Sequence, residues 1–323
     1  MLDEIAAQIT PASEQAGALV RAMIETHLSA CAPDSLTRVA MMVAEAQHSS
    51  HPRVTKPTAV VCAADHGVSG VKAPSLTLEI MRALGESSSA LQTAARAANA
   101  TVLIADCGAV GGEPNTGGPG SLSFRIGNGT NDFRAEAAMT PVCAVHAVQA
   151  GIALGLSLGE GNTDLIALGG VGAGSATSAA TVIAALCGIP ASEFESDDAA
   201  IVAEALALHR PNSNTPLEVL ATVGGFEIGV LTGVILAASS IRIPIVLDDS
   251  VTVAAALLAA TIQPNVARYL IASHAVPRGY RAALDKLGLE PLFGVRISHG
   301  EGTGALLALP MIVAATGVVA ELG

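Results

Sequence analysis

The stretch Asp164–Ser178, DLIALGGVGAGSATS, decides how this chain folds. It opens on a short apolar run typical of a buried parallel strand, and its glycines lead into a helix expected from Ala179 to Cys187. A strand, a glycine-rich turn and a helix start together make a generic cradle for a phosphate group. The glycine spacing also resembles a dinucleotide fingerprint, but the acidic residue expected roughly 20 residues later is not clearly placed. A tight turn packed closely on the sheet explains the same glycines equally well.

Apolar runs of the same kind recur on both sides of this stretch. They alternate with helical patterns and lie at residues 58–64, 101–105, 243–247 and 269–272. Short apolar strands that alternate with helices predict an α/β fold, a Rossmann-like parallel sheet with helices on both faces. Within it we expect one helix over Leu76–Ala98 and a loop over Gly111–Gly129.

The two chain ends lie outside this alternation. We expect residues 1–55 to supply N-terminal helices, 56–275 to form a large α/β domain, and 276–323 to carry a loop and a helix. The two terminal segments together predict a small helical domain.

Composition narrows the class of function. Hydrophobic residues make up 51% of the 323 residues, the formal net charge is −12, and aromatic residues are only 2%. With no basic run and few aromatic side chains, nucleic acid and anionic membranes are poor partners. The five cysteines have no metal-site spacing, and we expect no apolar run long enough to span a membrane. We therefore expect a cytoplasmic protein with no metal and no cofactor.

Polar residues gather after the predicted strands. Asp65 and His66 follow the first strand, Asp106 the second, and Asp248 and Asp249 the fourth. The carboxyl ends of parallel strands meet at one edge, where open α/β sheets bind ligands. Asp65 and His66 could equally order that edge without doing chemistry.

The segment Ser298–Ala305, SHGEGTGA, isolates one carboxylate, Glu301, among small residues. The run Ala305–Val319 predicts a helix that begins at this loop. In a partly dry pocket, desolvation raises the pKa of a carboxyl group toward values useful for accepting a proton. The alternative is that Glu301 only caps the helix, which is worth roughly 1 kcal/mol.

Several motifs in one order resemble a known family. They are AADHGV at 63–68, RIGNGT at 125–130, VGGFEI at 223–228, VLD at 246–248, LGLEP at 287–291 and GEGTGA at 300–305. The chain resembles the nicotinate-nucleotide:dimethylbenzimidazole phosphoribosyltransferases, which activate the lower ligand of cobalamin, from about Leu36 to Met311.

The resemblance implies a parallel α/β domain, a small helical domain and a dimer. It implies transfer of phosphoribose from nicotinate mononucleotide to a base or a phenol, with inversion at the anomeric carbon and release of nicotinate. Glu301 would be the general base. The acceptor pocket would contain Ser75, Leu76 and Glu79. The phosphoribosyl group would be surrounded by Gly172, Gly174, Ser175, Thr177, Gly300, Gly302 and Thr303.

The chain departs from the family pattern at positions near the donor. A glutamate of the glycine loop is replaced by Gly170, a lysine near the phosphate aligns with Asp198, and a serine there aligns with Val276. Exchanging a positive for a negative charge beside a phosphate costs several kcal/mol at an effective dielectric constant of about 20. Three interpretations follow: an active transferase with an altered site, a catalytically weak subunit that supports an active homologue in a heterodimer, and a dinucleotide-binding oxidoreductase.

Overall fold

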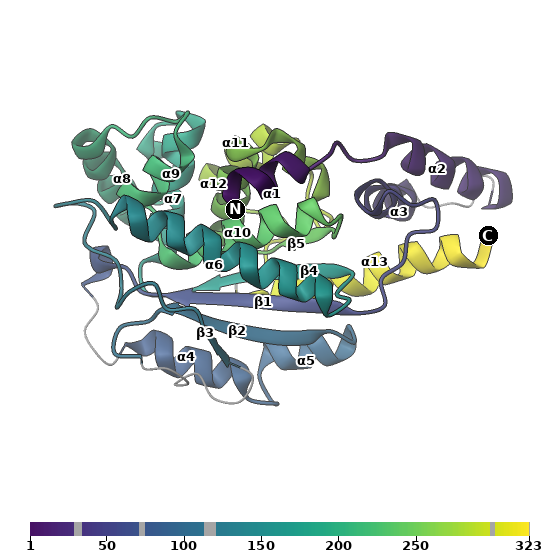
Figure 1. The fold of residues 1–323 in the computed structure, drawn as a ribbon, viewed down its shortest axis with the longest axis horizontal. Coiled ribbons are helices and arrows are strands. Elements are labelled where there is room, and N and C mark those ends of the chain that lie inside the picture. Colours follow the sequence, from purple (N-terminus) through teal and green to yellow (C-terminus); the bar gives the residue numbers. More distant parts are fainter. Residues whose placement is uncertain (29–33, 71–74, 113–120, 298–300, 323) are drawn as a thin grey trace.

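The computed structural model describes residues 1–28, 34–70, 75–112, 121–297 and 301–322. Within these ranges six strands, all parallel, form one sheet in the order β3-β2-β1-β4-β5-β6 (Figure 1). The strands are β1 Pro57–Ala64, β2 Thr101–Gly108, β3 Ser121–Ser123, β4 Leu165–Val171, β5 Ile245–Leu247 and β6 Leu270–Ala272. The chain runs outward from β1 to β3, then returns beside β1 and continues outward to β6. This reversal defines the ligand-binding edge of a Rossmann-like sheet, so the predicted fold class is confirmed.

Strand β1 lies at the centre of the sheet and is buried along its whole length. Its side chains alternate between two cores: Val60 and Cys62 face one, and Val61 and Ala63 face the other. Successive side chains of a strand point to opposite faces, so a strand covered on both sides must be apolar throughout. This is why the apolar residues of β1 form a continuous run in the sequence instead of alternating with polar residues.

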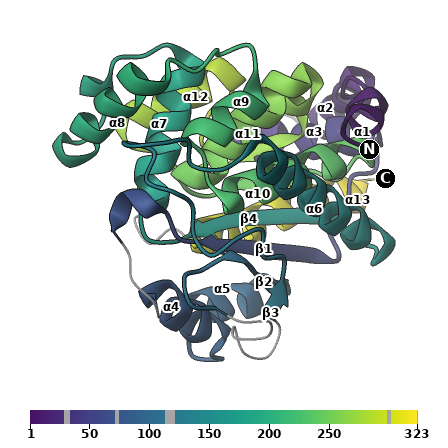
Figure 2. The ribbon, with the colours of Figure 1, turned by 60° about the vertical axis from the view of Figure 1, so that its left-hand side comes forward.

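Helices cover both faces of the sheet (Figure 2). One layer packs on the Val60 face and contains α1 Leu2–Gln8, α6 Pro141–Glu160, α7 Ser175–Cys187, α8 Ser196–His209, α9 Pro216–Val223, α10 Phe226–Ser240, α11 Ser250–Ile262 and α12 Arg278–Leu287. The other layer contains α2 Glu14–Leu28, α3 Asp34–Gln47, α4 Leu76–Gly85, α5 Ala90–Ala97 and α13 Thr303–Leu322.

Helices α6 and α10 approach each other unusually closely. A Cβ atom added at Gly151 would lie 1.9 Å from the carbonyl oxygen of Val230, and one added at Gly233 would lie 2.0 Å from that of Val148. The two backbones therefore touch through glycines, which lets a core poor in aromatic side chains remain close-packed.

The two chain ends form the expected helical cluster. Helices α2 and α3 pack on each other, and α13 packs on both. The predicted small helical part of the fold is therefore confirmed. Helix α1 instead packs against α6 and α10. The domain boundaries after residues 55 and 275 stay a prediction.

Two local expectations were wrong. The predicted loop over Gly111–Gly129 contains β3, a three-residue edge strand that pairs with Ile104–Asp106 of β2. It was missed because none of its residues is buried, so it carries no apolar pattern. The predicted helix over Leu76–Ala98 is two helices, because the hydroxyl of Ser89 caps α5 by accepting the Gln92 N–H.

The expectation that no apolar segment is long enough to span a membrane was also wrong. Helices α6 and α13 each have 20 residues and are long and apolar enough to do so. In each, 44% of the most apolar window is buried inside the molecule, and core helices of soluble proteins pass the same test. Length and composition of these helices are therefore weak evidence for a membrane.

Candidate active site

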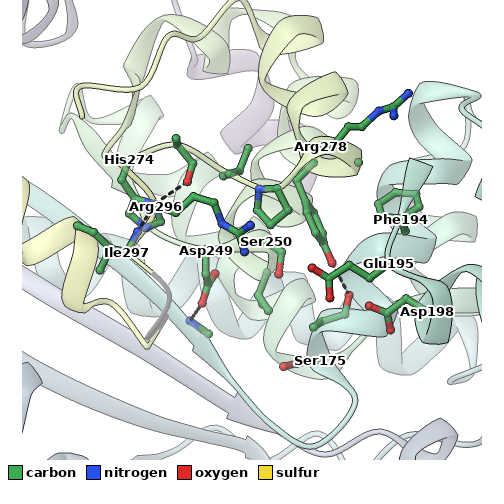
Figure 3. A pocket seen from close by; sticks show the side chains of 18 of the residues that line it. Ser175, Phe194, Glu195, Asp198, Asp249, Ser250, His274, Arg278, Arg296 and Ile297 are labelled. Atoms are coloured by element: carbon green, nitrogen blue, oxygen red, sulfur yellow. Dashed lines mark hydrogen bonds between the residues drawn. The ribbon is translucent and has the colours of Figure 1, made fainter. Parts of the chain in front are cut away.

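A pocket of about 610 Å³ opens at the carboxyl ends of β4, β5 and β6 (Figure 3). Its wall is built from the turn at Gly170–Gly172, the start of α7, the Asp249–Val251 segment and the chain that leads from β6 into α12. Glu193, Phe194, Glu195 and Asp198 close a further side, and Arg296, Ile297 and Glu301 also line the pocket. The pocket therefore lies at the edge that the sequence predicted for ligand binding.

Asp248 anchors the loop that carries Glu301. It follows β5, is 2% exposed, and accepts hydrogen bonds from the N–H groups of Gly302 and Ala305, both at 2.8 Å. The N–H groups at a helix start otherwise have no partner within the helix. The carboxylate that satisfies the start of α13 thus comes from the sheet, whereas the alternative interpretation of the sequence assigned that role to Glu301.

Glu301 is held in a strained backbone conformation against the end of β4. Its φ is 62°, and that of Gly302 is 88°. A Cβ atom added at Gly169 would lie 2.3 Å from the backbone nitrogen of Gly302. A left-handed conformation costs a non-glycine residue roughly 1–2 kcal/mol, so the surrounding contacts must impose it. The Asp248 hydrogen bonds and the close approach of Gly169 do so, and they place Glu301 in the pocket wall.

Asp249 presents a second carboxyl group to the pocket. It caps α11 by accepting the Thr252 N–H at 2.9 Å, and it also accepts the Gly170 N–H at 3.1 Å. Burial raises the pKa of Asp249 to about 7, and the neighbouring charge of Asp248 adds to this. The sequence placed Asp249 at a strand end but did not single it out as a site residue.

His274 follows β6 and lies beside the same carboxylates. Its Nε2 is 3.3 Å from Oδ1 of Asp248, and its Nδ1 is 2.9 Å from the carbonyl oxygen of Ala275. Burial alone lowers the pKa of His274, but the contacts with Asp248 and Ala275 and the charges of Asp248 and Asp249 outweigh it, so the pKa is raised. Sequence reasoning missed this residue; its position directly after a strand was the available signal.

Comparison with known proteins places the chain in a family. A phosphoribosyltransferase family model, DBI_PRT, matches residues 9–323. The chain belongs to this phosphoribosyltransferase family. It is similar to a protein of Roseiflexus sp. (strain RS-1) named nicotinate-nucleotide–dimethylbenzimidazole phosphoribosyltransferase, with 38% identity over 339 residues that cover 100% of this chain and 96% of the relative. A Chloroflexus aggregans protein of the same name is 38% identical over 89% of this chain and 85% of its own length.

Solved structures agree with this membership. The crystal structure of CobT from Thermus thermophilus superposes with a TM-score of 0.84 and 32% sequence identity, over 95% of this chain and 96% of that one. The predicted family and the predicted enzyme class, a phosphoribosyltransferase, are thus confirmed.

The phosphoribosyl residues predicted for this phosphoribosyltransferase lie partly in the pocket wall. Gly172 and Ser175 line it, as does Glu301. Gly174, Thr177 and Gly302 are not in the wall but each is the sequence neighbour of a lining residue, and Thr303 lies two residues after Glu301. Gly300 falls outside the described residues.

The glycine turn also has a packing role. A Cβ atom added at Gly172 would lie 1.6 Å from the carbonyl oxygen of Ala64, so the turn packs directly on β1. The hydroxyl of Thr177 donates to Asp198 at 2.6 Å. Asp198 and Val276, the residues predicted to align with a lysine and a serine of the family, both line the pocket.

The residues predicted for the acceptor lie at the start of α4, outside the pocket wall. Ser75 is buried and its hydroxyl has no hydrogen-bond partner among the described residues, whereas Leu76 and Glu79 are exposed. Residues 71–74, which precede them, are outside the described ranges.

Asp65 joins the start of α4 to the glycine turn. Its buried carboxylate accepts hydrogen bonds from the Thr77 hydroxyl at 2.5 Å, the Val110 N–H at 2.6 Å and the Ala173 N–H at 3.2 Å. His66 likewise contacts Glu227 at 2.8 Å, and both side chains are fully buried. This geometry supports an ordering role for Asp65 and His66 at the sheet edge.

Proposed function

We propose that this phosphoribosyltransferase transfers phosphoribose from nicotinate mononucleotide to an aromatic lower-ligand base or phenol in cobamide biosynthesis, with inversion at the anomeric carbon. The names of the relatives support the donor and the class of acceptor. The observation that carries the proposal is the fixed position of Glu301 in the pocket wall, against Gly169 and held through Asp248.

The reaction needs a single proton acceptor. Nicotinate leaves from a positively charged ring nitrogen, so the electron pair of the breaking C–N bond neutralises that nitrogen and no acid is required. The acceptor forms the new bond to the anomeric carbon and must then lose a proton. A benzimidazole attacks through its unprotonated ring nitrogen and loses the proton of its other ring nitrogen, whereas a phenol loses the proton of the attacking oxygen. The Glu301 carboxylate takes that proton, a role that contributes typically 10²- to 10⁴-fold to a rate.

The test is transfer by the purified chain alone. Nicotinate mononucleotide is incubated with dimethylbenzimidazole, and released nicotinate and the riboside phosphate product are followed by liquid chromatography. We expect turnover by the native chain and a loss of about 10²- to 10⁴-fold in kcat for Glu301→Gln. Glu290→Gln is the matched control, because Glu290 is exposed, pairs with Arg38 and lies outside the pocket wall. Wild-type turnover in Glu301→Gln would reject the proposed base.

A second candidate function is structural support of an active homologue in a heterodimer. Asp198 and Val276 in the pocket wall favour it, because neither provides the positive charge or hydroxyl expected beside a phosphate. Coexpression of the chain with a homologue from the same genome tests this. A mixed dimer whose activity survives Glu301→Gln, but not loss of the partner's corresponding glutamate, would support the helper role.

A further inference from the structure

The pocket is acidic for an enzyme whose proposed donor is an anion. Among the residues that the structure describes, five carboxyl groups line it: Glu193, Glu195, Asp198, Asp249 and Glu301. The cationic side chains that the described part of the wall contains are Arg278 and Arg296, joined by His274 when protonated. A phosphate group placed near Asp198 and Glu195 would be repelled unless a nearby cation compensated for them.

Arg278 does not provide that cation. Its Nε lies 2.8 Å and its Nη2 3.1 Å from the two carboxylate oxygens of Glu193, which makes a bidentate ion pair. The side chain is 83% exposed, and its guanidinium group points away from the middle of the pocket (Figure 3). The charge of Arg278 is therefore paired with Glu193 and faces away from the pocket.

Arg296 has the opposite arrangement. It extends into the pocket between His274 and Ser250 (Figure 3), and within the part of the chain that the structure describes it forms no ion pair. The segment that carries it is attached to the sheet by the N–H of Ala275, which lies 3.0 Å from the Phe293 carbonyl oxygen and 3.2 Å from that of Val295. Among the described residues, Arg296 is thus an uncompensated guanidinium group in the wall of the pocket.

We propose that Arg296 binds the phosphate group of the donor and is the residue that makes this pocket select a nucleotide over the corresponding nucleoside. The inference rests on the proposed function for the identity of the donor. A guanidinium group presents N–H donors in a fork that matches two phosphate oxygens. The N-terminus of α7, which has no side-chain cap and begins at Ser175 in the pocket wall, carries a partial positive charge that favours the same anion.

The position of Arg296 has a consequence for affinity. The phosphate is held by one solvent-accessible cation opposed by Asp198, whose carboxylate is fixed by the Thr177 hydroxyl. Removing the cation should therefore weaken nucleotide binding, and removing the opposing charge should strengthen it. Neither change should alter binding of the same ligand without its phosphate.

Calorimetric titration of the full chain with nicotinate mononucleotide and with nicotinate riboside tests this. We expect Arg296→Ala to weaken binding of the mononucleotide about 10- to 100-fold, as for loss of a charge-assisted contact, and to leave the riboside unchanged. Arg296→Lys should keep most of the affinity, and Asp198→Asn should tighten the mononucleotide about 10-fold. Arg281→Ala is the matched control, an exposed arginine of α12 paired with Asp285 outside the pocket.

Equal loss of both ligands in Arg296→Ala, or no loss of either, would overturn the assignment. Failure of the proposed function looks different: the wild-type chain would bind the mononucleotide in the Arg296-dependent way but release no nicotinate in the presence of an acceptor. Conversely, turnover by a chain whose mononucleotide affinity is independent of Arg296 would retain the function and reject the inference.

Discussion

Asp249 should make the folded state less stable as pH rises, and its replacement by asparagine should remove this effect. Its pKa is raised from 3.8 to about 7 in the folded protein. Between these two values the unfolded chain has lost the proton and the folded chain still holds it. The folded state therefore binds more protons, and its stability falls with pH from about 4 to about 7 and is level above.

The structure sets the size of the effect. A shift of about three pKa units corresponds to at most roughly 4 kcal/mol over the whole window, and to about 2.7 kcal/mol between pH 5 and pH 7. Asp249 also faces the pocket and is only partly buried, so solvent screens part of this. We expect about 2 kcal/mol after that screening. Asparagine retains an oxygen able to cap α11 but cannot ionise.

The assay is urea unfolding followed by far-ultraviolet circular dichroism, because the chain has no tryptophan. Wild type and Asp249→Asn are compared at pH 5, 6, 7 and 8 in one buffer series. The quantity of interest is the difference between their free energies of unfolding, because other groups that titrate, including His274, contribute to both proteins. From pH 5 to pH 8 the free energy of unfolding of Asp249→Asn should rise by about 2 kcal/mol relative to that of the wild type.

A difference that stays constant across these pH values would refute the reasoning. It would mean that Asp249 ionises as an ordinary carboxyl group, and that burial and the charge of Asp248 do not perturb it. A shift of the opposite sign would mean that the two N–H groups it accepts from outweigh burial.

Three further predictions concern the residues that build the site. Asp248→Asn should lower the free energy of unfolding by about 2–4 kcal/mol and remove most transfer activity, because the single oxygen of an amide cannot accept from both N–H groups that fix the Glu301 loop. Urea unfolding and the transfer assay measure these two effects. Normal transfer activity would contradict the prediction. Gly172→Ala should unfold or aggregate, since its Cβ atom would lie 1.6 Å from a β1 carbonyl oxygen; a melting temperature within a few degrees of wild type would argue against this packing. Asp65→Ala should lower the free energy of unfolding by about 3 kcal/mol, because three buried or part-buried donors lose their acceptor, and an effect below about 1 kcal/mol would show that water replaces it.

Much of the architecture was predictable because its signals are local. A strand buried on both faces must be apolar along its length, as β1 is, and helix boundaries at Thr140 and Gly288 follow from capping chemistry within a few residues. The edge strand β3 was not predictable in this way. It is short and carries no buried residue, so nothing in its sequence separates it from loop.

The residues of the candidate site also fall into those with a local sequence signal and those without one. Glu301 and the glycine turn stood out because small residues isolate them in the sequence. Asp249 and His274 gave no comparable signal, since what distinguishes each is a neighbour from another element. Arg296 gave none either, since what distinguishes it is its place in the pocket wall.

The sequence by itself determined the class of fold, the family and the carboxylate in the Gly-Glu-Gly loop, because periodicity, capping and motif order are properties of neighbouring residues. Only the tertiary structure decided what holds that carboxylate and what surrounds it. Asp248 and Gly302 are 54 residues apart in the chain. They meet because Asp248 follows β5 and Gly302 packs on Gly169 of the neighbouring strand β4. The charges that face one another across the pocket come from separate loops, so their balance exists only after the sheet has formed.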